Sequence, residues 1–276
     1  LNKKYYGVKT YTSLRFRKMS IQVKLPNLSI LGLSSNPSFE EFIPFSSFKG
    51  KDEDGIVFTK ESEFISTWEI KGVAFEVEDD DKLNKLNRLI GNIFTSFSNE
   101  SVVFYFHNAR HNVDTKLESK YSNSYLQDVN DLYYKSFTKG NSKATTLYLT
   151  MVYNPFLNVT EKKQFQNLSK NRYENELLNL MMKFKDYSNR LEANLSKFRA
   201  TKLNIYKEDG KTYSSQLEFY NYLIGGRFLK TRALNSPIND YLIGGLKNIQ
   251  FAHDLIQLNY NDGTKQFAQE IEIKDY

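Results

Sequence analysis

The sequence predicts an α+β protein with a mostly antiparallel sheet, flanking helices and one long helix. Runs rich in β-branched and aromatic residues are interspersed with stretches of helical period, in the order strands, helix, strand, helix, strand, long helix, strand, helix, hairpin. This order favours pairing between neighbouring strands over a parallel sheet built from crossover units. Hydrophobic residues make up 40% and charged residues 25% of the 276 residues, as in an ordinary folded soluble protein.

The first predicted elements are three short strands that form an antiparallel meander. Charged or glycine-containing turns separate them, as between the strands of consecutive hairpins. Trp68 lies among strand residues, so we expect it in the core. The three runs are Ile56–Lys60, Glu63–Ile70 and Val73–Val77.

A helix follows, because the apolar residues then recur at helical spacing. Asp79, Asp80 and Asp81 precede it, where negative charge stabilises a helix N-terminus. Gly91 lies inside the helix and costs ~1 kcal/mol relative to Ala. The apolar face consists of Leu83, Leu86, Leu89, Ile90, Ile93, Phe94 and Phe97.

The middle of the chain predicts two strands around a shorter helix, and we expect the first strand to be buried. The strands are Val102–His107 and Thr145–Tyr153, and the helix covers Tyr125–Phe137. The second strand alternates apolar residues on its two sides and ends before Pro155. The stretch "HNARHN" after the first strand is typical of a loop, so we expect loop or surface histidines there.

The long helix is predicted from about Glu161 to Phe198. An apolar stripe repeats by three, four or seven residues, which fits one helix or two helices joined near Asn189. This length exceeds that of most globular helices, so the helix projects or packs against a partner helix. Its exposed face either mediates self-association or is simply solvated.

The C-terminal part predicts a strand, a turn, a helix and a hairpin. The strand covers Lys202–Tyr206, the turn Glu208–Gly210 and the helix Ser214–Ile224. Two apolar runs around Asp262-Gly263 indicate a β-hairpin, because Asp-Gly suits a tight two-residue turn.

Residues 1–39 form a basic N-terminal arm or linker ahead of the folded part at 40–276. The net charge of the whole chain is +6, and Leu1–Phe39 contains no Asp or Glu. The arm is either a solvated segment, a contact for anionic lipid headgroups, or a contact for nucleic-acid phosphates. We expect membrane or partner contacts from Lys9, Arg15, Arg17, Lys18 and Lys24.

No catalytic, cofactor-binding or metal site is predicted. "YLIGG" occurs at Tyr222–Gly226 and again at Tyr241–Gly245, but neither copy is followed by the Gly-Lys-Ser/Thr of a phosphate-binding loop. We interpret both copies as helix ends where Gly adopts the left-handed conformation. There is no Cys, and His107 and His111 have no evident third metal ligand.

Several stretches, taken in order, resemble the N-terminal region of the type IV secretion ATPase family, the VirB/CagE/TrbE component. The resemblance covers Phe42–Tyr276. It depends on "FIPFSSFKGKDEDGIVFTKESEFISTWEIKGVAFE", "DDDKLNKLNRLIGNIFTSF", "SVVFYFHNARH", "LYLTMVYNP", "LEFYNYLIGGRF", "NDYLIGG" and "YNDGTKQFAQEIEIKDY".

The resemblance implies part of a hexameric ATPase that energises substrate secretion and pilus assembly at the cytoplasmic face of the bacterial inner membrane. The family's Walker motifs lie further along, so the motor domain is absent, and ATP and Mg²⁺ are expected only for the parent protein. Because the chain starts at Leu1 rather than Met, we expect a piece of a longer polypeptide.

Implied partners are other copies of the chain (a dimer, or a hexamer in the parent), a small inner-membrane secretion subunit, other secretion-system components and the membrane surface. A basic nucleic-acid-binding module and an enzyme with an unfamiliar site are the alternatives.

Overall fold

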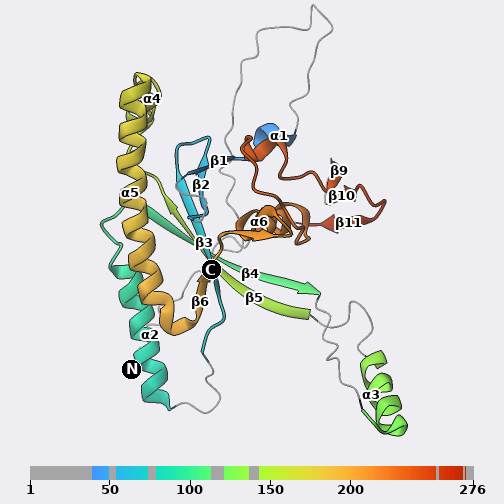
Figure 1. Cartoon of the computed structure of the whole chain (residues 1–276). Coiled ribbons are helices and arrows are strands. Elements are labelled where there is room, and N and C mark those ends of the chain that lie inside the picture. Colours follow the sequence, from blue (N-terminus) through green and yellow to red (C-terminus); the bar gives the residue numbers. More distant parts are fainter. Residues whose placement is uncertain are drawn as a thin grey trace, which may run out of the picture.

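A computed structural model describes residues 39–49, 54–73, 79–112, 121–136, 143–252, 255–269 and 271 (Figure 1). It confirms the α+β class, with antiparallel sheets and one long helix. The helices are α1 (Phe39–Phe42), α2 (Asp80–Thr95), α3 (Ser124–Ser136), α4 (Val159–Gln166), α5 (Lys170–Leu195) and α6 (Ser215–Gly225), with short 3₁₀ turns η2 (Ser196–Phe198) and η3 (Ile238–Asp240). The strands are β1 (Phe45–Lys49), β2 (Ile56–Thr59), β3 (Phe64–Ile70), β4 (Val102–Asn112), β5 (Lys143–Tyr153), β6 (Ala200–Lys202), β7 (Ile205–Glu208), β8 (Lys211–Ser214), β9 (Leu246–Phe251), β10 (Ile256–Tyr260) and β11 (Lys265–Ala268).

The main sheet is antiparallel, with strands in the order β1-β2-β3-β5-β4 and with β6 also paired to β3. Two strands share one edge of β3, because β2 pairs with Phe64 and Ile65 while β6 pairs with Trp68–Ile70. β5 pairs along the whole opposite edge. β3 is therefore the central strand, and Trp68 is fully buried in it, as predicted. The predicted strand Val73–Val77 lies mostly outside the described residues.

The β4–β5 hairpin is longer than the sequence predicts. Its register runs from Val102↔Tyr153 to Asn112↔Lys143 without interruption. The prediction of a loop at "HNARHN" is therefore wrong. His107 and Ala109 are buried while Asn108 and Arg110 are exposed, which is the alternation of a strand with one face on the core.

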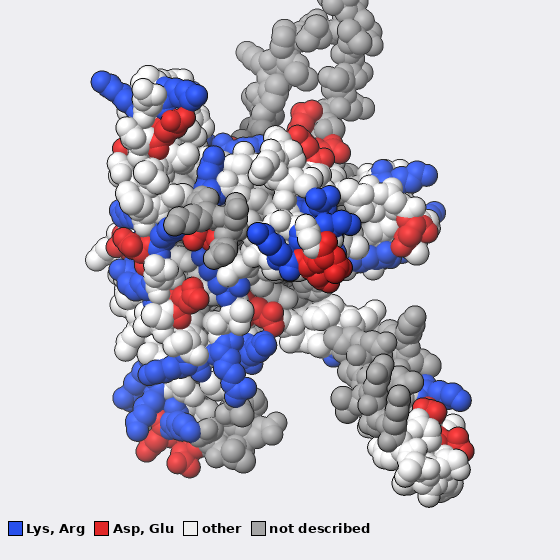
Figure 2. Space-filling model, in the orientation of Figure 1, with Lys and Arg blue, Asp and Glu red and all other residues white. Residues whose placement is uncertain are grey.

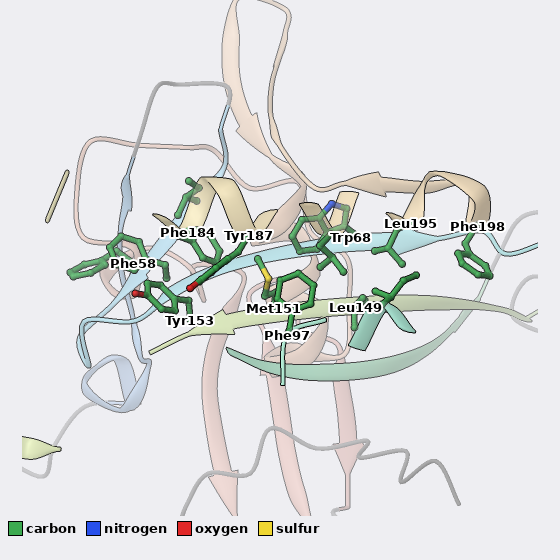
Figure 3. Packing of buried hydrophobic residues seen from close by; sticks show 14 residues of the cluster. Phe58, Trp68, Phe97, Leu149, Met151, Tyr153, Phe184, Tyr187, Leu195 and Phe198 are labelled. Carbon is green, nitrogen blue, oxygen red and sulfur yellow. The ribbon is translucent and has the colours of Figure 1, made fainter. Parts of the chain in front are cut away.

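One face of the sheet is covered by α2 and α5. Phe184 and Leu191 of α5 are fully buried there against Phe64 and Leu149 of the sheet. Figure 3 shows this cluster, with side chains from the helices meeting those of the central strands. Each large side chain buried in this way contributes about 1.5–3 kcal/mol.

The predicted long helix is two helices, but the break is not near Asn189. It falls after Gln166, where Asn167 ends α4 and Ser169 caps the start of α5 in extended backbone. α5 then runs unbroken for 26 residues, and only its C-terminal half contains buried side chains. Because the apolar residues keep a helical spacing across the break, the sequence pattern does not reveal where one helix ends and the next begins.

The opposite face of the sheet is covered by α6 and η3. Ser214 caps α6, its side chain accepting a hydrogen bond from the Leu217 N–H at 3.3 Å. The ring of Tyr220 stacks on Phe45 with centroids 4.0 Å apart. These contacts form a second core of apolar side chains, which includes Val57, Ile65, Leu217, Ile238 and Leu242.

Two small sheets complete the fold. The predicted strand Lys202–Tyr206 is divided, since β6 joins the main sheet while β7 pairs with β8. The predicted C-terminal hairpin is confirmed by β10 and β11, and β9 adds a third strand that the sequence analysis missed. Within the described residues, no helix has the length and apolar character needed to cross a membrane.

Candidate interaction surface

The predicted contact residues of the basic arm are not among those that the structure describes. Lys9, Arg15, Arg17, Lys18 and Lys24 all fall in the undescribed segment before residue 39. Their role remains a prediction from sequence alone.

His107 and His111 both pack against aromatic rings. His107 is buried on β4, with its ring 5.3 Å from that of Phe219, and burial lowers its pKa to about 4. The ring of His111 lies 5.2 Å from that of Phe228. In the described part of the chain, no group of three His, Cys, Asp or Glu could hold a metal ion. Both histidines are packing residues on the face covered by α6.

The two "YLIGG" copies end differently. Gly226 ends α6 with φ 70°, and its N–H donates to the Tyr222 carbonyl, which confirms the left-handed helix cap. The second copy is a turn before β9, and neither Gly244 nor Gly245 has positive φ. There the predicted cap is wrong. A Cβ at Gly245 would instead meet the end of the Leu229 side chain, which would have to move to admit it.

One Gly-Lys-Thr triplet, at Gly210–Thr212, precedes both copies. It lies in the tight turn between β7 and β8, with Gly210 at φ 69°. A phosphate-binding loop connects a strand to a helix and has a Gly five residues before this one. Ile205 stands at that position, so the triplet is a hairpin turn and no phosphate loop.

An apolar groove opens between α2 and the main sheet. Its volume is about 370 Å³, which lies within the range of roughly 300–1,000 Å³ typical of binding pockets. Side chains from α2, the ends of β3 and α5, and the β4–β5 hairpin line it. They include Leu83, Leu86, Ile90, Phe106, Leu147 and Phe198. Such a wall favours an apolar occupant.

Exposed basic residues flank this groove. The Lys71 N–H lies 3.5 Å from the Arg199 carbonyl, so these two exposed residues come together at the end of β3. Lys197 and Arg88 are also exposed and adjoin the lining residues Phe198 and Asn87. Figure 2 shows blue side chains over this end of the molecule, at the lower left, with red ones at the tip of α2.

α3 presents a second apolar surface. It lies in the connection between β4 and β5, away from the body of the molecule (Figure 1). Tyr125, Leu126, Val129 and Leu132 are between 46% and 70% exposed, and helical spacing places them on one face. The polar side chains of Gln127 and Asn130 are less exposed. The helix thus presents its apolar side to solvent.

Comparison with known proteins agrees with the sequence resemblance. A family model described as "Type IV secretion system ATPase VirB4/TrbE, N-terminal domain" matches residues 55–177. A second, "CagE, TrbE, VirB family, component of type IV transporter system", matches residues 201–276. The chain belongs to this family of type IV secretion ATPases.

Relatives in the VirB4 family include the type IV secretion system protein virB4 of Brucella abortus. It is 29% identical over 255 residues, covering 88% of this chain and 30% of the relative. CagE of Helicobacter pylori is 25% identical over 81% of this chain and 24% of its own length. PtlC of Bordetella pertussis is 22% identical over 85% of this chain and 28% of its own. The chain therefore spans less than a third of the curated relatives that it matches.

Proposed function

We propose that this chain is the non-catalytic N-terminal assembly and membrane-docking domain of a type IV secretion ATPase. The match of residues 55–177 to the family's N-terminal domain is the observation that carries this proposal. The sequence contains no complete G-x-x-x-x-G-K-[ST] motif, so ATP and Mg²⁺ would bind in the motor domain of the parent protein. That motor would energise substrate transport and pilus biogenesis.

The domain would act at the cytoplasmic face of the bacterial inner membrane. Its partners would be other copies of itself, a small inner-membrane secretion subunit and other components of the secretion system. The basic arm supports this location, because Lys and Arg next to a membrane gather on its cytoplasmic side. Each basic residue near an anionic surface contributes about 1 kcal/mol.

Sedimentation with lipid vesicles tests membrane docking. The purified chain should bind vesicles that contain phosphatidylglycerol, and this binding should weaken as the salt concentration rises. It should not bind vesicles of phosphatidylcholine alone. A variant with Gln at Lys9, Arg15, Arg17, Lys18 and Lys24 should lose this binding.

A charge-matched control separates the arm from the overall charge. It replaces five exposed lysines elsewhere with Gln and should still bind. Equal loss in both variants would refute a specific role for the arm, and ATP hydrolysis that copurifies with the chain would refute its non-catalytic role. The control positions are Lys163, Lys170, Lys207, Lys211 and Lys247.

A nucleic-acid-binding module is the alternative, supported by the net charge of +6 and the acid-free arm. Phosphate contacts would make binding fall steeply with salt. A titration of single-stranded DNA decides between the two functions. Affinity for DNA that exceeds affinity for anionic vesicles at equal salt would favour the alternative, and no binding at low salt would remove it.

A further inference from the structure

We propose that α3 of one copy of this chain docks into the apolar groove beside α2 of a second copy. This inference rests on the self-association proposed above and names the two surfaces that would form the contact. Each surface is apolar and accessible in the single chain, and exposed apolar groups of this kind mark interaction sites.

The donor surface is the outward face of α3. Leu132 is 65% exposed and Tyr125 is 70% exposed. A helix usually buries such a stripe against its own core. Here the helix stands off the body at the end of a hairpin (Figure 1), so the stripe is positioned to enter a partner.

The acceptor surface is the groove lined by α2 and the sheet. Ile90 of α2 is 38% exposed at this groove. An amphipathic helix that lays apolar anchors at three- and four-residue spacing into a groove is a recurring mode of protein recognition. The spacing of Tyr125, Val129 and Leu132 matches that mode.

Charge favours this pairing over a membrane. The exposed Asp128 neighbours Tyr125 and Leu132 on the helix surface, and Lys71 and Arg199 at the groove have the opposite sign. Helices that lie on membranes carry Lys and Arg on their polar face. α3 has only Lys135 against Asp128 and Asp131, so an anionic lipid surface would repel it.

Geometry favours a contact between copies. α3 and α2 lie at opposite sides of the molecule in Figure 1. A helix on one side that fits a groove on the other makes a head-to-tail contact. Repetition of such a contact closes a ring or extends a filament, depending on the rotation.

Disulfide trapping tests the contact, since the chain contains no Cys. One variant carries Leu132→Cys on α3, and a separate variant carries Asn87→Cys at the exposed rim of the groove. Mixed and oxidised, they should form a heterodimer. A matched control replaces Leu132→Cys with Gln127→Cys, which lies on the opposite, polar side of the same helix. It should give at least about tenfold less product.

Three outcomes would overturn the proposal. The first is equal trapping by the control, and the second is no trapping of either pair. The third uses a variant with both cysteines in one chain: if only this variant forms the disulfide, the groove holds the α3 of its own chain. Sedimentation of Leu126→Glu/Leu132→Glu gives a second readout. Both side chains are exposed, so the fold should survive, and association should weaken by more than about tenfold. Unchanged association with intact vesicle binding would exclude these surfaces and leave the membrane-docking function standing.

Discussion

Acidification should destabilise this domain through His107. The imidazole is buried on β4, and its Nε2 has no hydrogen-bond partner among the residues that the structure describes. Burial disfavours the charged form, so the pKa falls from 6.5 to about 4 in the folded chain. The unfolded chain binds this proton more tightly than the folded one. Stability is therefore complete above pH ~6.5 and declines as the pH falls toward 4.

The magnitude follows from the difference between the two pKa values. One pKa unit corresponds to ~1.4 kcal/mol, so a drop from 6.5 to about 4 corresponds to ~3.4 kcal/mol in total. Between pH 7 and pH 4.5 the linkage relation gives a loss of ~2.4 kcal/mol in the free energy of unfolding. That loss is a large fraction of the ~5–15 kcal/mol typical of a domain.

Chemical denaturation at the two pH values measures this loss. Trp68 is the single tryptophan and is fully buried, so its fluorescence reports unfolding of the main sheet. The unchanged chain and His107→Leu are compared at both pH values, because protonation of carboxylates affects both alike. The unchanged chain should lose ~2.4 kcal/mol more than the variant.

Equal losses in the two proteins would refute this reasoning. They would mean that His107 in the folded chain is protonated near its usual pKa of 6.5, because water or a rearranged contact stabilises the charged ring. A direct titration of the histidine ring by NMR would then show a midpoint near 6.5 instead of near 4.

Four substitutions probe packing and backbone, each measured by urea denaturation. Leu191→Ala, at a fully buried position of α5, should lower stability by about 3–5 kcal/mol, while Leu178→Ala on the exposed side of the same helix should cost less than about 1 kcal/mol. Gly226→Ala should cost ~1–2 kcal/mol, because φ is 70° and the new Cβ would lie 2.9 Å from the Gln266 side chain. Gly91→Ala should instead stabilise by about 0.5–1 kcal/mol, since it lies inside α2 with nothing within 4 Å of the new Cβ.

The elements that the sequence predicted well have a strong local signal. β3 and β5 are rich in β-branched and aromatic residues, and both fall within two residues of their predicted ends. α6 begins where Ser214 supplies a cap and ends at Gly226. In each case propensity, period and boundary residues agree, which is the condition under which local reasoning succeeds.

The elements that it missed depend on contacts distant in sequence. The second half of β4 is polar, and pairing with β5 holds it extended despite its loop-like composition. The local pattern of Lys202–Tyr206 indicates one continuous strand. In the structure, the Leu203 N–H donates to the Thr67 carbonyl of the main sheet, and beyond this contact the chain leaves that sheet to form β7. Neither partner is visible in the local pattern.

Of the two proposed contact surfaces, the sequence predicted the helix α3, but it predicted neither the exposure of its apolar face nor the groove beside α2. The period of α3 predicted the helix itself, yet the same stripe would suit a helix packed on its own core. Only the structure shows the stripe turned outward. The groove is lined by segments as distant in sequence as Ile70 and Phe198, so no local motif could have indicated it.

The edge of β3 that β2 and β6 share determines which fragments of this chain could fold by themselves. One family model stops at residue 177 and the other begins at 201, as though two modules met inside α5. Yet β6, at that second boundary, pairs with the same edge of β3 as β2 does. A fragment that ends at residue 177 would leave Trp68 beside an open strand edge and strip Phe184 and Leu191 from its core. The two matched regions therefore share one sheet and one core, and neither can complete that core without the other.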